Sequence, residues 1–361
     1  MPKSKSKTIA SLTPGTVLAR RLEAWVSESP EAGHRGAIAQ TIVALAEAGA
    51  SLAHVIAAGD AVTASAAVVG GAGSGDGQKQ LDVEADAIVL AALKSAPVAF
   101  IASEESEHPV AVNPGAPLLV AVDPLDGSSN IDTNAPIGTI FSILPASSDP
   151  GVTGDGFLSP ISTHLAAGYI VYGPRCALVM TLGTHTEMYG LDPVTREFKL
   201  AVPEVKIPRS SKEFAINMSN NRHWRPEVRA YVEDCLEGAE GPMAKDFNMR
   251  WLASAVGEAH RILMRGGIYL YPADDRKGYT KGRLRLLYEG APLGMVIEAA
   301  GGRATDGETG IAALSPTSIH QRTPLVFGSA DDVARFTRYT QDRHAMPERA
   351  PLFKNRGLFR N

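Results

Sequence analysis

The residue types best suited to chemistry gather in residues 122–132, which read VDPLDGSSNID and follow the apolar run APLLVA. Pro124 fixes the backbone between Asp123 and Asp126, so both carboxylates can turn toward one cation. The carbonyl oxygen of Leu125 is free to be a further ligand. Asp, Pro, Gly and Ser also make up ordinary surface turns, so this stretch alone leaves both interpretations open.

The next three residues add the chemistry of phosphate binding. Gly127, Ser128 and Ser129 offer successive backbone N–H groups with no side chain at the first position, and such a nest of N–H groups binds phosphate. Carboxylates for a metal beside donors for a phosphate predict metal-assisted hydrolysis of a phosphate ester. Asp132 lies beyond this turn, and we expect it to be structural.

Further carboxylates stand at the ends of predicted elements: Asp76 and Asp82 in GDGQKQLD, Glu104 and Glu105 in ASEE, and Glu289 in LLYEG. Mg²⁺ prefers oxygen ligands and keeps water and phosphate oxygens around it, so carboxylates collected on one rim of a sheet would suit it. Adjacent residues of an extended chain point oppositely, so one of Glu104 and Glu105 could hold metal while the other faces water. Each carboxylate taken alone is also consistent with a solvated loop.

An alternation of helices and strands must position these residues. Apolar residues at helical spacing predict a helix over residues 37–58 and another over 83–96. The runs VAFIASEE (98–105) and LLVAVDP (118–124) predict two buried strands that end in acidic residues. Residues 60–77 are rich in Ala and Gly and predict a flexible loop. This order is typical of an α/β core.

The remainder of the chain divides at a stretch rich in Pro, Lys and Ser over residues 203–212. Before it, closely spaced short runs between 138 and 205 predict an antiparallel meander in one sheet. After it, we predict a strand in FAIN, helices over 227–236 and about 249–264, strands in GIYLYP and LRLLYE, a helix over 292–300, a strand in PLVFGS and a last helix from Asp331.

Length and composition bound the organisation and the partners. The 361 residues suffice for about two domains, and we expect a flexible tail over 1–16, an N-terminal domain over 17–205, a C-terminal domain over 206–340 and a flexible tail over 341–361. With 35 basic and 39 acidic residues, the net charge of −4 argues against a nucleic-acid partner. We find no secretory signal and no apolar run near the ~18 residues of a membrane span, so no membrane partner is expected.

The two cysteines, Cys176 and Cys235, lie far apart in the sequence. They suggest neither a disulfide framework nor a zinc site, and so favour a reducing, cytoplasmic location.

The opening stretch belongs to a longer segment, VDPLDGSSNIDTNAPIGTIFSI, that closely resembles the metal and phosphate motif of class I fructose-1,6-bisphosphatases. These enzymes are part of a lithium-sensitive, magnesium-dependent phosphatase superfamily that also contains the inositol monophosphatases. GRLRLLYEGAPLGMVIEAAGG (282–302) resembles the second signature of the family, and SIHQRTPLVFGSADDV (318–333) resembles its closing segment. The matches run in family order from about residue 75 to residue 333.

Carried over residue by residue, the resemblance implies a magnesium centre with more than one ion, in which manganese could substitute. Asp82 and Glu105 would hold and deprotonate the attacking water. Arg285 would reach the reacting phosphate together with the substrate-binding turn formed by Asp126, Gly127, Ser128 and Ser129. The implied metal ligands are Glu104, Asp123, Asp126, Glu289, the Leu125 carbonyl and Asp76. Residues 60–77 resemble the mobile loop that brings Asp76 and Asp82 to the metals.

At the far end of a sugar bisphosphate, the resemblance implies contacts from Asn217, Tyr271 and Arg283, and from Arg250 of a neighbouring subunit in a homotetramer. The chain departs from the family here, because NMSN stands where N-E-G-Y is expected, Trp251 replaces a tyrosine and Arg283 replaces a lysine. An arginine still holds a phosphate. Sedoheptulose 1,7-bisphosphate, one carbon longer, therefore stays a candidate substrate beside fructose 1,6-bisphosphate.

The resemblance implies an α/β fold, a layered α-β-α-β-α sandwich of two domains, each a mixed sheet with helices. The implied enzyme removes the 1-phosphate of fructose 1,6-bisphosphate, in gluconeogenesis or the Calvin cycle. An inositol-type monophosphatase is weaker, because the chain is longer and carries LRLLYE and GGIYLYP. A catalytically silent sugar-phosphate sensor is weaker still, because the metal and base carboxylates are all present.

Little inhibition by AMP is expected through the site used by AMP-sensitive members of the family. Members of the family that respond to AMP carry a Lys-Tyr pair just ahead of the DPLDG strand, whereas this chain has Pro117 and Leu118 there. We therefore predict weak or absent AMP inhibition through that site.

Overall fold

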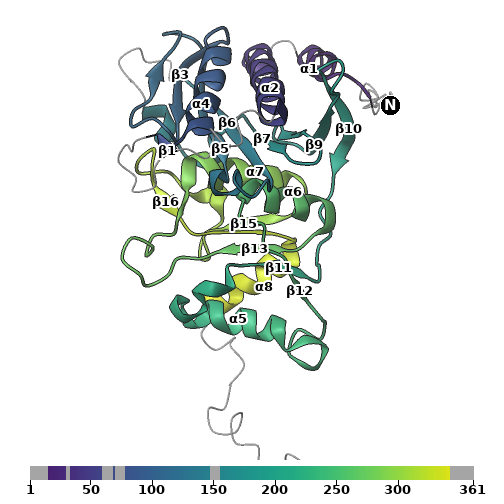
Figure 1. Cartoon of the computed structure of the whole chain (residues 1–361), viewed down its shortest axis with the longest axis vertical. Coiled ribbons are helices and arrows are strands. Elements are labelled where there is room, and N and C mark those ends of the chain that lie inside the picture. Colours follow the sequence, from purple (N-terminus) through teal and green to yellow (C-terminus); the bar gives the residue numbers. More distant parts are fainter. Residues whose placement is uncertain (1–14, 30–32, 59–67, 70–77, 147–154, 342–361) are drawn as a thin grey trace, which may run out of the picture.

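The structure is a computed structural model that describes residues 15–29, 33–58, 68–69, 78–146 and 155–341 (Figure 1). Two sheets alternate with three layers of helices along the long axis of the molecule (Figure 1). This is the predicted α-β-α-β-α sandwich. Asp76, most of the predicted loop over residues 60–77 and most of both predicted tails lie outside the described residues.

The first sheet has eight strands in the order β10-β9-β8-β7-β6-β5-β3-β4. Among the described strands of this sheet, β3 and β5 pair in parallel and all other neighbours pair antiparallel. The consecutive antiparallel pairing from β6 to β10 confirms the predicted meander. The strands are β3 (Val98–Ser103), β4 (Val110–Ala111), β5 (Leu118–Asp126), β6 (Ile137–Pro145), β7 (Ala166–Tyr172), β8 (Ala177–Thr181), β9 (Thr186–Leu191) and β10 (Phe198–Val205). All nine residues of β5 are buried.

In the described part of the chain, three helices cover the outer face of this sheet: α1 (Leu18–Ser27), α2 (Arg35–Ala58) and α4 (Gln80–Leu93). Helix α1 was not predicted from the sequence; it is held by a buried ion pair of 2.8 Å between Arg21 and Glu187 on β9. Short strands β1 (Val68–Val69) and β2 (Gln78–Lys79) pair ahead of α4.

Within the described residues, α2 is the one helix long and apolar enough to cross a membrane by length and composition, although Gln40 and Glu47 interrupt its apolar residues, so it is not the continuous apolar run that a membrane span was expected to need. Half of its most apolar window is buried, and the helix contacts α1, α4 and β7. The buried core helix of a globular domain passes the same test.

The second sheet has five strands in the order β12-β11-β13-β17-β15. Its strands are β11 (Glu213–Ala215), β12 (Asn248–Met249), β13 (Ile268–Tyr271), β15 (Arg303–Thr305) and β17 (Leu325–Gly328). Helices α5 (Pro226–Leu236) and α8 (Ala330–Gln341) pack on its outer face, while α6 (Ala255–Arg265) and α7 (Ala291–Ala299) lie between the two sheets (Figure 1). The layer of α6 and α7 therefore joins the two sheets.

Two predicted elements need correction. The helix expected from about residue 249 begins at Ala255, because Ser254 caps it by accepting a hydrogen bond from the N–H of Gly257 at 3.1 Å. The strand expected over LRLLYE is confined to β14 (Leu284–Arg285), which pairs with β16 (Arg322–Thr323). After it, Leu286–Gly290 forms a helical turn that leads into α7.

Candidate metal and phosphate site

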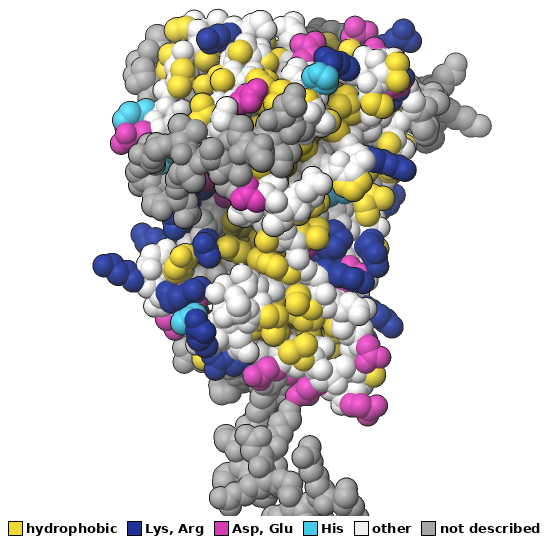
Figure 2. All heavy atoms as spheres, viewed as in Figure 1, with side chains coloured by type: hydrophobic (Ala, Val, Ile, Leu, Met, Phe, Trp, Pro, Cys, Tyr) yellow, Lys and Arg dark blue, Asp and Glu magenta, His cyan; other side chains and the backbone are white. Residues whose placement is uncertain are grey.

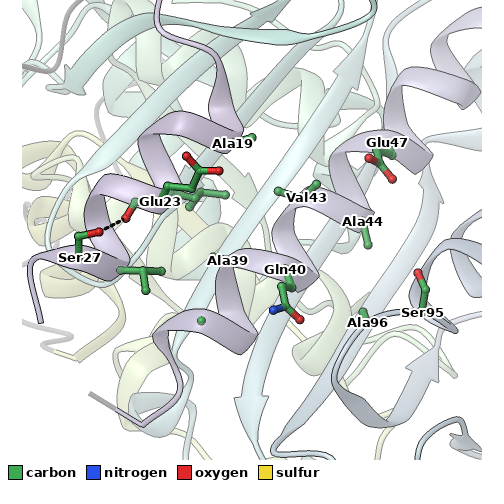
Figure 3. A pocket seen from close by; sticks show the side chains of 13 residues that line it. Ala19, Glu23, Ser27, Ala39, Gln40, Val43, Ala44, Glu47, Ser95 and Ala96 are labelled. Carbon is green, nitrogen blue, oxygen red and sulfur yellow. Dashed lines mark hydrogen bonds between the residues drawn. The ribbon is translucent and has the colours of Figure 1, made fainter. Parts of the chain in front are cut away.

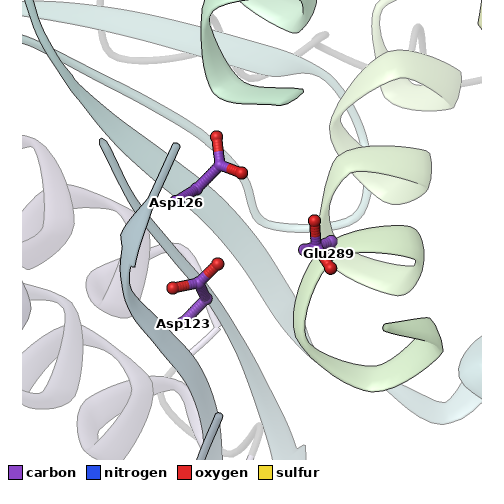
Figure 4. Close-up of side chains that lie close together, drawn as sticks. All are labelled: Asp123, Asp126 and Glu289. Atoms are coloured by element: carbon purple, nitrogen blue, oxygen red, sulfur yellow. The ribbon is translucent and has the colours of Figure 1, made fainter. Parts of the chain in front are cut away.

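Three buried carboxylates meet where the first sheet faces the central helices. Asp123 and Asp126 come from the end of β5, and Glu289 comes from the turn before α7 (Figure 4). One oxygen from each lies within 4.8 Å of the others. The structure thus brings together three of the predicted metal ligands.

The end of β5 is shaped to present its two aspartates. The regular pairing of β5 with β6 is interrupted between Asp123 and Asp126. The Leu125 N–H donates to Asp123 Oδ1 at 3.0 Å, and the Thr139 hydroxyl donates to the Pro124 carbonyl at 2.8 Å. These bonds fix the kinked backbone, so both carboxylates turn toward the same space.

The carboxylate of Asp126 is oriented by the start of α6. Asp126 Oδ2 accepts hydrogen bonds from the Ser254 hydroxyl at 3.1 Å and from the Val256 N–H at 2.9 Å. A helix N-terminus favours a negative charge. Asp126 therefore links the cluster to the central helix layer.

Burial and mutual repulsion raise the pKa values of the cluster. Burial, followed by the charges of Glu104, Asp126 and Glu289, holds the pKa of Asp123 well above its ordinary value. The pKa of Glu289 is also held well above its ordinary value, mainly by burial and then by the negative charges of Glu104 and Asp126. Burial raises the pKa of Asp126 to about 6, although the bonds from Val256 and Ser254 oppose the rise.

Such a cluster fits a divalent cation. Buried charges are stable only when paired or coordinated to a metal, and hard cations such as Mg²⁺ take carboxylate oxygens. The donor set is all oxygen and contains no His or Cys. These residues therefore suit magnesium better than zinc or copper.

Arg285 and Glu104 border the cluster. Arg285 Nη2 lies 3.6 Å from Glu104 Oε1, and the Arg285 backbone N–H donates to Glu289 Oε2 at 2.6 Å. The buried Nε of Arg285 has no hydrogen-bond partner among the described residues. A guanidinium with a spare buried donor beside a carboxylate cluster can bind a phosphate oxygen.

The predicted phosphate turn begins in a left-handed conformation. Gly127 has φ 81° and ψ 28° and precedes a single 3₁₀ turn, Ser128–Asn130. The Asn130 side-chain amide donates to the Leu252 carbonyl at 2.9 Å, which ties this turn to the segment before α6. A β-carbon at Gly127 would lie 3.1 Å from Ser254 Cβ. The position thus favours glycine both by conformation and by space.

The two residues predicted to handle the attacking water lie on separate elements. Asp82 is buried in the first turn of α4, a helix that contacts β3 and β5. Glu105 is exposed in the turn that follows β3, and its N–H lies 3.3 Å from Ser103 Oγ. Glu104 and Glu105 lie in a turn and not in an extended strand, so the argument that adjacent residues of an extended chain point oppositely does not apply to them.

The far-end residues gather in a hollow of the C-terminal half. Asn217, Tyr271 and Arg283 line it together with Asn220 and Asp274. Arg250 is absent from this lining; its half-exposed guanidinium lies 3.8 Å from Glu213. On the face drawn in Figure 2, Lys and Arg side chains gather on both flanks of the C-terminal half. The net negative charge of the chain therefore coexists with local positive patches.

A larger cavity of about 670 Å³ lies apart from these residues, between α1 and α2 (Figure 3). Its lining includes Glu23, Gln40, Val43 and Glu47 and contains none of the predicted site residues. Its size alone does not make it the catalytic site.

Three residues that support the site were not predicted. Ser254 and Asn130 bind across the interface between β5 and α6. His320 lies with Nε2 3.0 Å from the Ser106 carbonyl and with its ring 5.5 Å from that of Tyr288. A serine ahead of a helical run is an N-cap signal, so the capping role of Ser254 could have been predicted from the sequence. Asn130 and His320 bond to residues far away in the sequence, and no local sequence pattern predicts those contacts.

Taken together, the layered fold, the carboxylate cluster and the glycine-led turn define a class: a phosphatase whose site suits a divalent cation. Two family models match the chain, "Fructose-1-6-bisphosphatase, N-terminal domain" over residues 26–203 and "Fructose-1-6-bisphosphatase, C-terminal domain" over residues 207–341. The chain belongs to the fructose-1,6-bisphosphatase family.

Its relatives include class 1 fructose-1,6-bisphosphatases of bacteria. The protein of Paracoccus denitrificans is 53% identical over 319 residues, covering 88% of this chain and 94% of that protein. The protein of Rhizobium meliloti is 52% identical over 325 residues, covering 90% and 93%. The crystal structure of Leishmania major fructose-1,6-bisphosphatase in its holo form superposes with a TM-score of 0.82 at 31% identity, covering 92% of this chain and all of that one.

Proposed function

We propose that this enzyme hydrolyses the 1-phosphate of fructose 1,6-bisphosphate, giving fructose 6-phosphate and inorganic phosphate. The observation that most strongly supports this proposal is the buried cluster of Asp123, Asp126 and Glu289 beside the Gly127 turn, in a chain of the fructose-1,6-bisphosphatase family. The cluster supplies cation ligands, and the turn supplies phosphate donors.

Magnesium is the proposed cofactor, with manganese able to replace it and more than one ion in each site. Asp123, Asp126, Glu289 and Glu104 would hold the principal ion, and the Leu125 carbonyl and Asp76 would contribute to neighbouring ions. When bound, the ions supply positive charge to the reacting oxygens. The raised pKa values of Asp123 and Glu289 support this assignment, since a cation would relieve their repulsion.

The remaining residues bind the phosphate and move a proton. Arg285 Nε and the N–H groups of Gly127, Ser128 and Ser129 would hold the reacting phosphate. Glu105, paired with Asp82, would accept a proton from the attacking water as general base. The water oxygen would form a bond to phosphorus as the bond from phosphorus to the C1 oxygen breaks. The C1 oxygen would take up a proton from solvent and become the hydroxyl of fructose 6-phosphate. No covalent enzyme intermediate is required.

Asn217, Tyr271 and Arg283 would hold the 6-phosphate, because all three line the same hollow. Arg250 would act on a neighbouring subunit in a homotetramer, consistent with its absence from that hollow in its own chain. The two free cysteines support a reducing, cytoplasmic location.

The test compares phosphate release from fructose 1,6-bisphosphate, sedoheptulose 1,7-bisphosphate and inositol 1-phosphate, each with magnesium and with a chelator. We expect the highest kcat/KM on fructose 1,6-bisphosphate, and loss of activity with the chelator. Preference for the inositol substrate, or activity that persists in the chelator, would overturn the proposal.

A further inference from the structure

The loop between β13 and β14, residues 272–283, forms one side of the far-end hollow and contains a tightly bonded ion pair. Asp274 is 4% exposed. Its carboxylate accepts from Arg276 Nε at 3.0 Å and 3.1 Å, from the Arg276 backbone N–H at 3.0 Å and, in a shorter contact, from Arg276 Nη2. This two-pronged contact fixes the guanidinium of Arg276 in one orientation.

Two guanidiniums contact the same aromatic ring in this loop. The Cζ atoms of Arg276 and Arg283 each lie 4.6 Å from the centre of the Tyr279 ring. Arg283 also lies 5.9 Å from the ring of Tyr271. The backbone holds Tyr279 in place, because its N–H donates to the Arg276 carbonyl at 2.9 Å and its carbonyl accepts from the Gly282 N–H at 3.0 Å.

The charges of the two arginines are compensated differently. Asp274 neutralises Arg276, whereas no carboxylate among the described residues forms an ion pair with Arg283. Arg283 therefore contributes an uncompensated positive charge to the hollow that contains Asn217 and Tyr271.

Arg276 also bonds to a residue that lines the hollow but lies outside the loop. Its Nη2 donates to Asn220 Oδ1 at 3.1 Å, and Asn220 lines the hollow with Asn217. Asn220 is the position at which the resemblance led us to expect a tyrosine. The Asp274–Arg276 pair thus spans from the loop to the segment that departs from the family pattern.

We propose that Tyr279 and the Asp274–Arg276 pair are positioning residues for the far-end phosphate of the substrate. Arg276 fixes the Tyr279 ring, and Tyr279 stacks Arg283 so that its guanidinium is already oriented toward the phosphate before substrate binds. A prearranged arginine loses less side-chain freedom on binding than a mobile one. This inference rests on the proposed function and assigns residues to it that the sequence motifs do not contain.

The experiment uses Tyr279→Leu, which removes the ring, and Tyr279→Phe, which keeps it. KM and kcat are measured on fructose 1,6-bisphosphate and on fructose 1-phosphate, which lacks the far-end phosphate. A cation–π contact predicts that Tyr279→Leu raises KM for the bisphosphate roughly 3- to 30-fold, with little change in kcat. KM for fructose 1-phosphate should not change, and Tyr279→Phe should recover most of the lost affinity.

Lys277→Ala serves as the matched control, because Lys277 is an exposed cation of the same loop outside these contacts; its kinetics should equal those of the unmodified enzyme. Arg276→Met removes the charge at similar length and should also raise KM for the bisphosphate alone, so the inference can be tested even if Tyr279→Leu fails to fold. Unchanged KM, or equal increases on both substrates, would overturn the inference. Failure of the unmodified enzyme to hydrolyse the bisphosphate would instead overturn the proposed function.

Discussion

At the scale of single residues, Ser254 has two roles that can be separated. Its hydroxyl donates to Asp126 and accepts from the Gly257 N–H as the cap of α6. We predict that Ser254→Ala weakens magnesium activation roughly 10- to 100-fold, as is typical when a residue behind a metal ligand is lost, and lowers the free energy of unfolding by about 1 kcal/mol. Magnesium titrations of activity and denaturant unfolding measure the two effects.

Ser254→Thr keeps the hydroxyl and is the control for this substitution. It should retain most of the magnesium affinity. An unchanged magnesium dependence in Ser254→Ala would show that Ser254 does not support the cluster.

The cluster also predicts a dependence of stability on pH in the metal-free enzyme. Burial raises the pKa of Asp126 to about 6, so the folded state binds its proton more tightly than the unfolded state. The free energy of unfolding should therefore fall as pH rises from about 4 through 6. In chelator at neutral pH, Asp126→Asn should be more stable than the unmodified enzyme by up to about 3 kcal/mol.

This difference should vanish near pH 4, where the carboxyl group is largely protonated in the folded state. Urea unfolding at several pH values in chelator provides the measurement. A less stable Asp126→Asn at neutral pH would contradict the burial of an uncompensated charge at this position.

How far the site could be predicted depends on the distance between partners in the sequence. Asp123 and Asp126 were predictable because they are close neighbours in the chain and a proline shapes the turn between them. The hydrogen bond from Ser254 to Asp126 joins positions 128 residues apart, and that from His320 to Ser106 joins positions 214 apart. No local pattern encodes such contacts. Tyr279 was missed for another reason, since its loop matches no motif.

At the scale of elements, the turn after β5 determines how phosphate can bind. Gly127 has φ 81°, and a β-carbon there would press on Ser254. We predict that Gly127→Ala lowers the free energy of unfolding by about 1–2 kcal/mol through left-handed strain and lowers kcat/KM for the bisphosphate by roughly tenfold or more, since a shift of about 1 Å in a site is enough. Unfolding and steady-state kinetics test both parts.

Gly183→Ala is a matched control. Gly183 has φ 92°, and a β-carbon at this position would meet nothing within 4 Å, so the substitution carries the same strain away from the site. It should lose similar stability and keep its activity. Equal kinetic effects of the two substitutions would mean that the Gly127 turn has no special contact with phosphate.

The spacing of apolar residues predicted the long helices and strands correctly. The helix over 37–58 and the meander were predicted, whereas α1 was not, because its attachment depends on the buried pair of Arg21 and Glu187. LRLLYE was predicted as a strand because its run of apolar residues is typical of a buried strand. In the structure, the hydrogen bond from the Arg285 N–H to the Glu289 carboxylate favours a helical turn over Leu286–Gly290 instead.

At the scale of the whole molecule, the site is assembled from both halves of the chain. β5 provides Asp123 and Asp126 from the first sheet, whereas Glu289 and Ser254 come from the helix layer between the sheets. The cluster therefore forms only when the second half of the chain packs against the first. Proper packing of the layers is a condition for activity.

The packing of the first sheet also supports a prediction about AMP. Leu118, at the position where AMP-sensitive members carry part of a Lys-Tyr pair, is fully buried as the first residue of β5, so it offers no polar group to a nucleotide. We predict that AMP at about 1 mM inhibits the enzyme less than about twofold, because its dissociation constant at this site should exceed ~1 mM. A titration of AMP at a substrate concentration near KM measures this, and strong cooperative inhibition would contradict it.

The most direct test of the central claim is magnesium-dependent phosphate release from fructose 1,6-bisphosphate by the unmodified enzyme and by Asp126→Asn. The substitution removes one negative charge from the cluster while preserving the shape of the side chain. We predict that Asp126→Asn folds, as circular dichroism would show, and loses at least roughly 100-fold in kcat, because metal-assisted charge stabilisation is worth several kcal/mol. Unchanged turnover in the folded variant would contradict the assignment of this cluster as the metal centre.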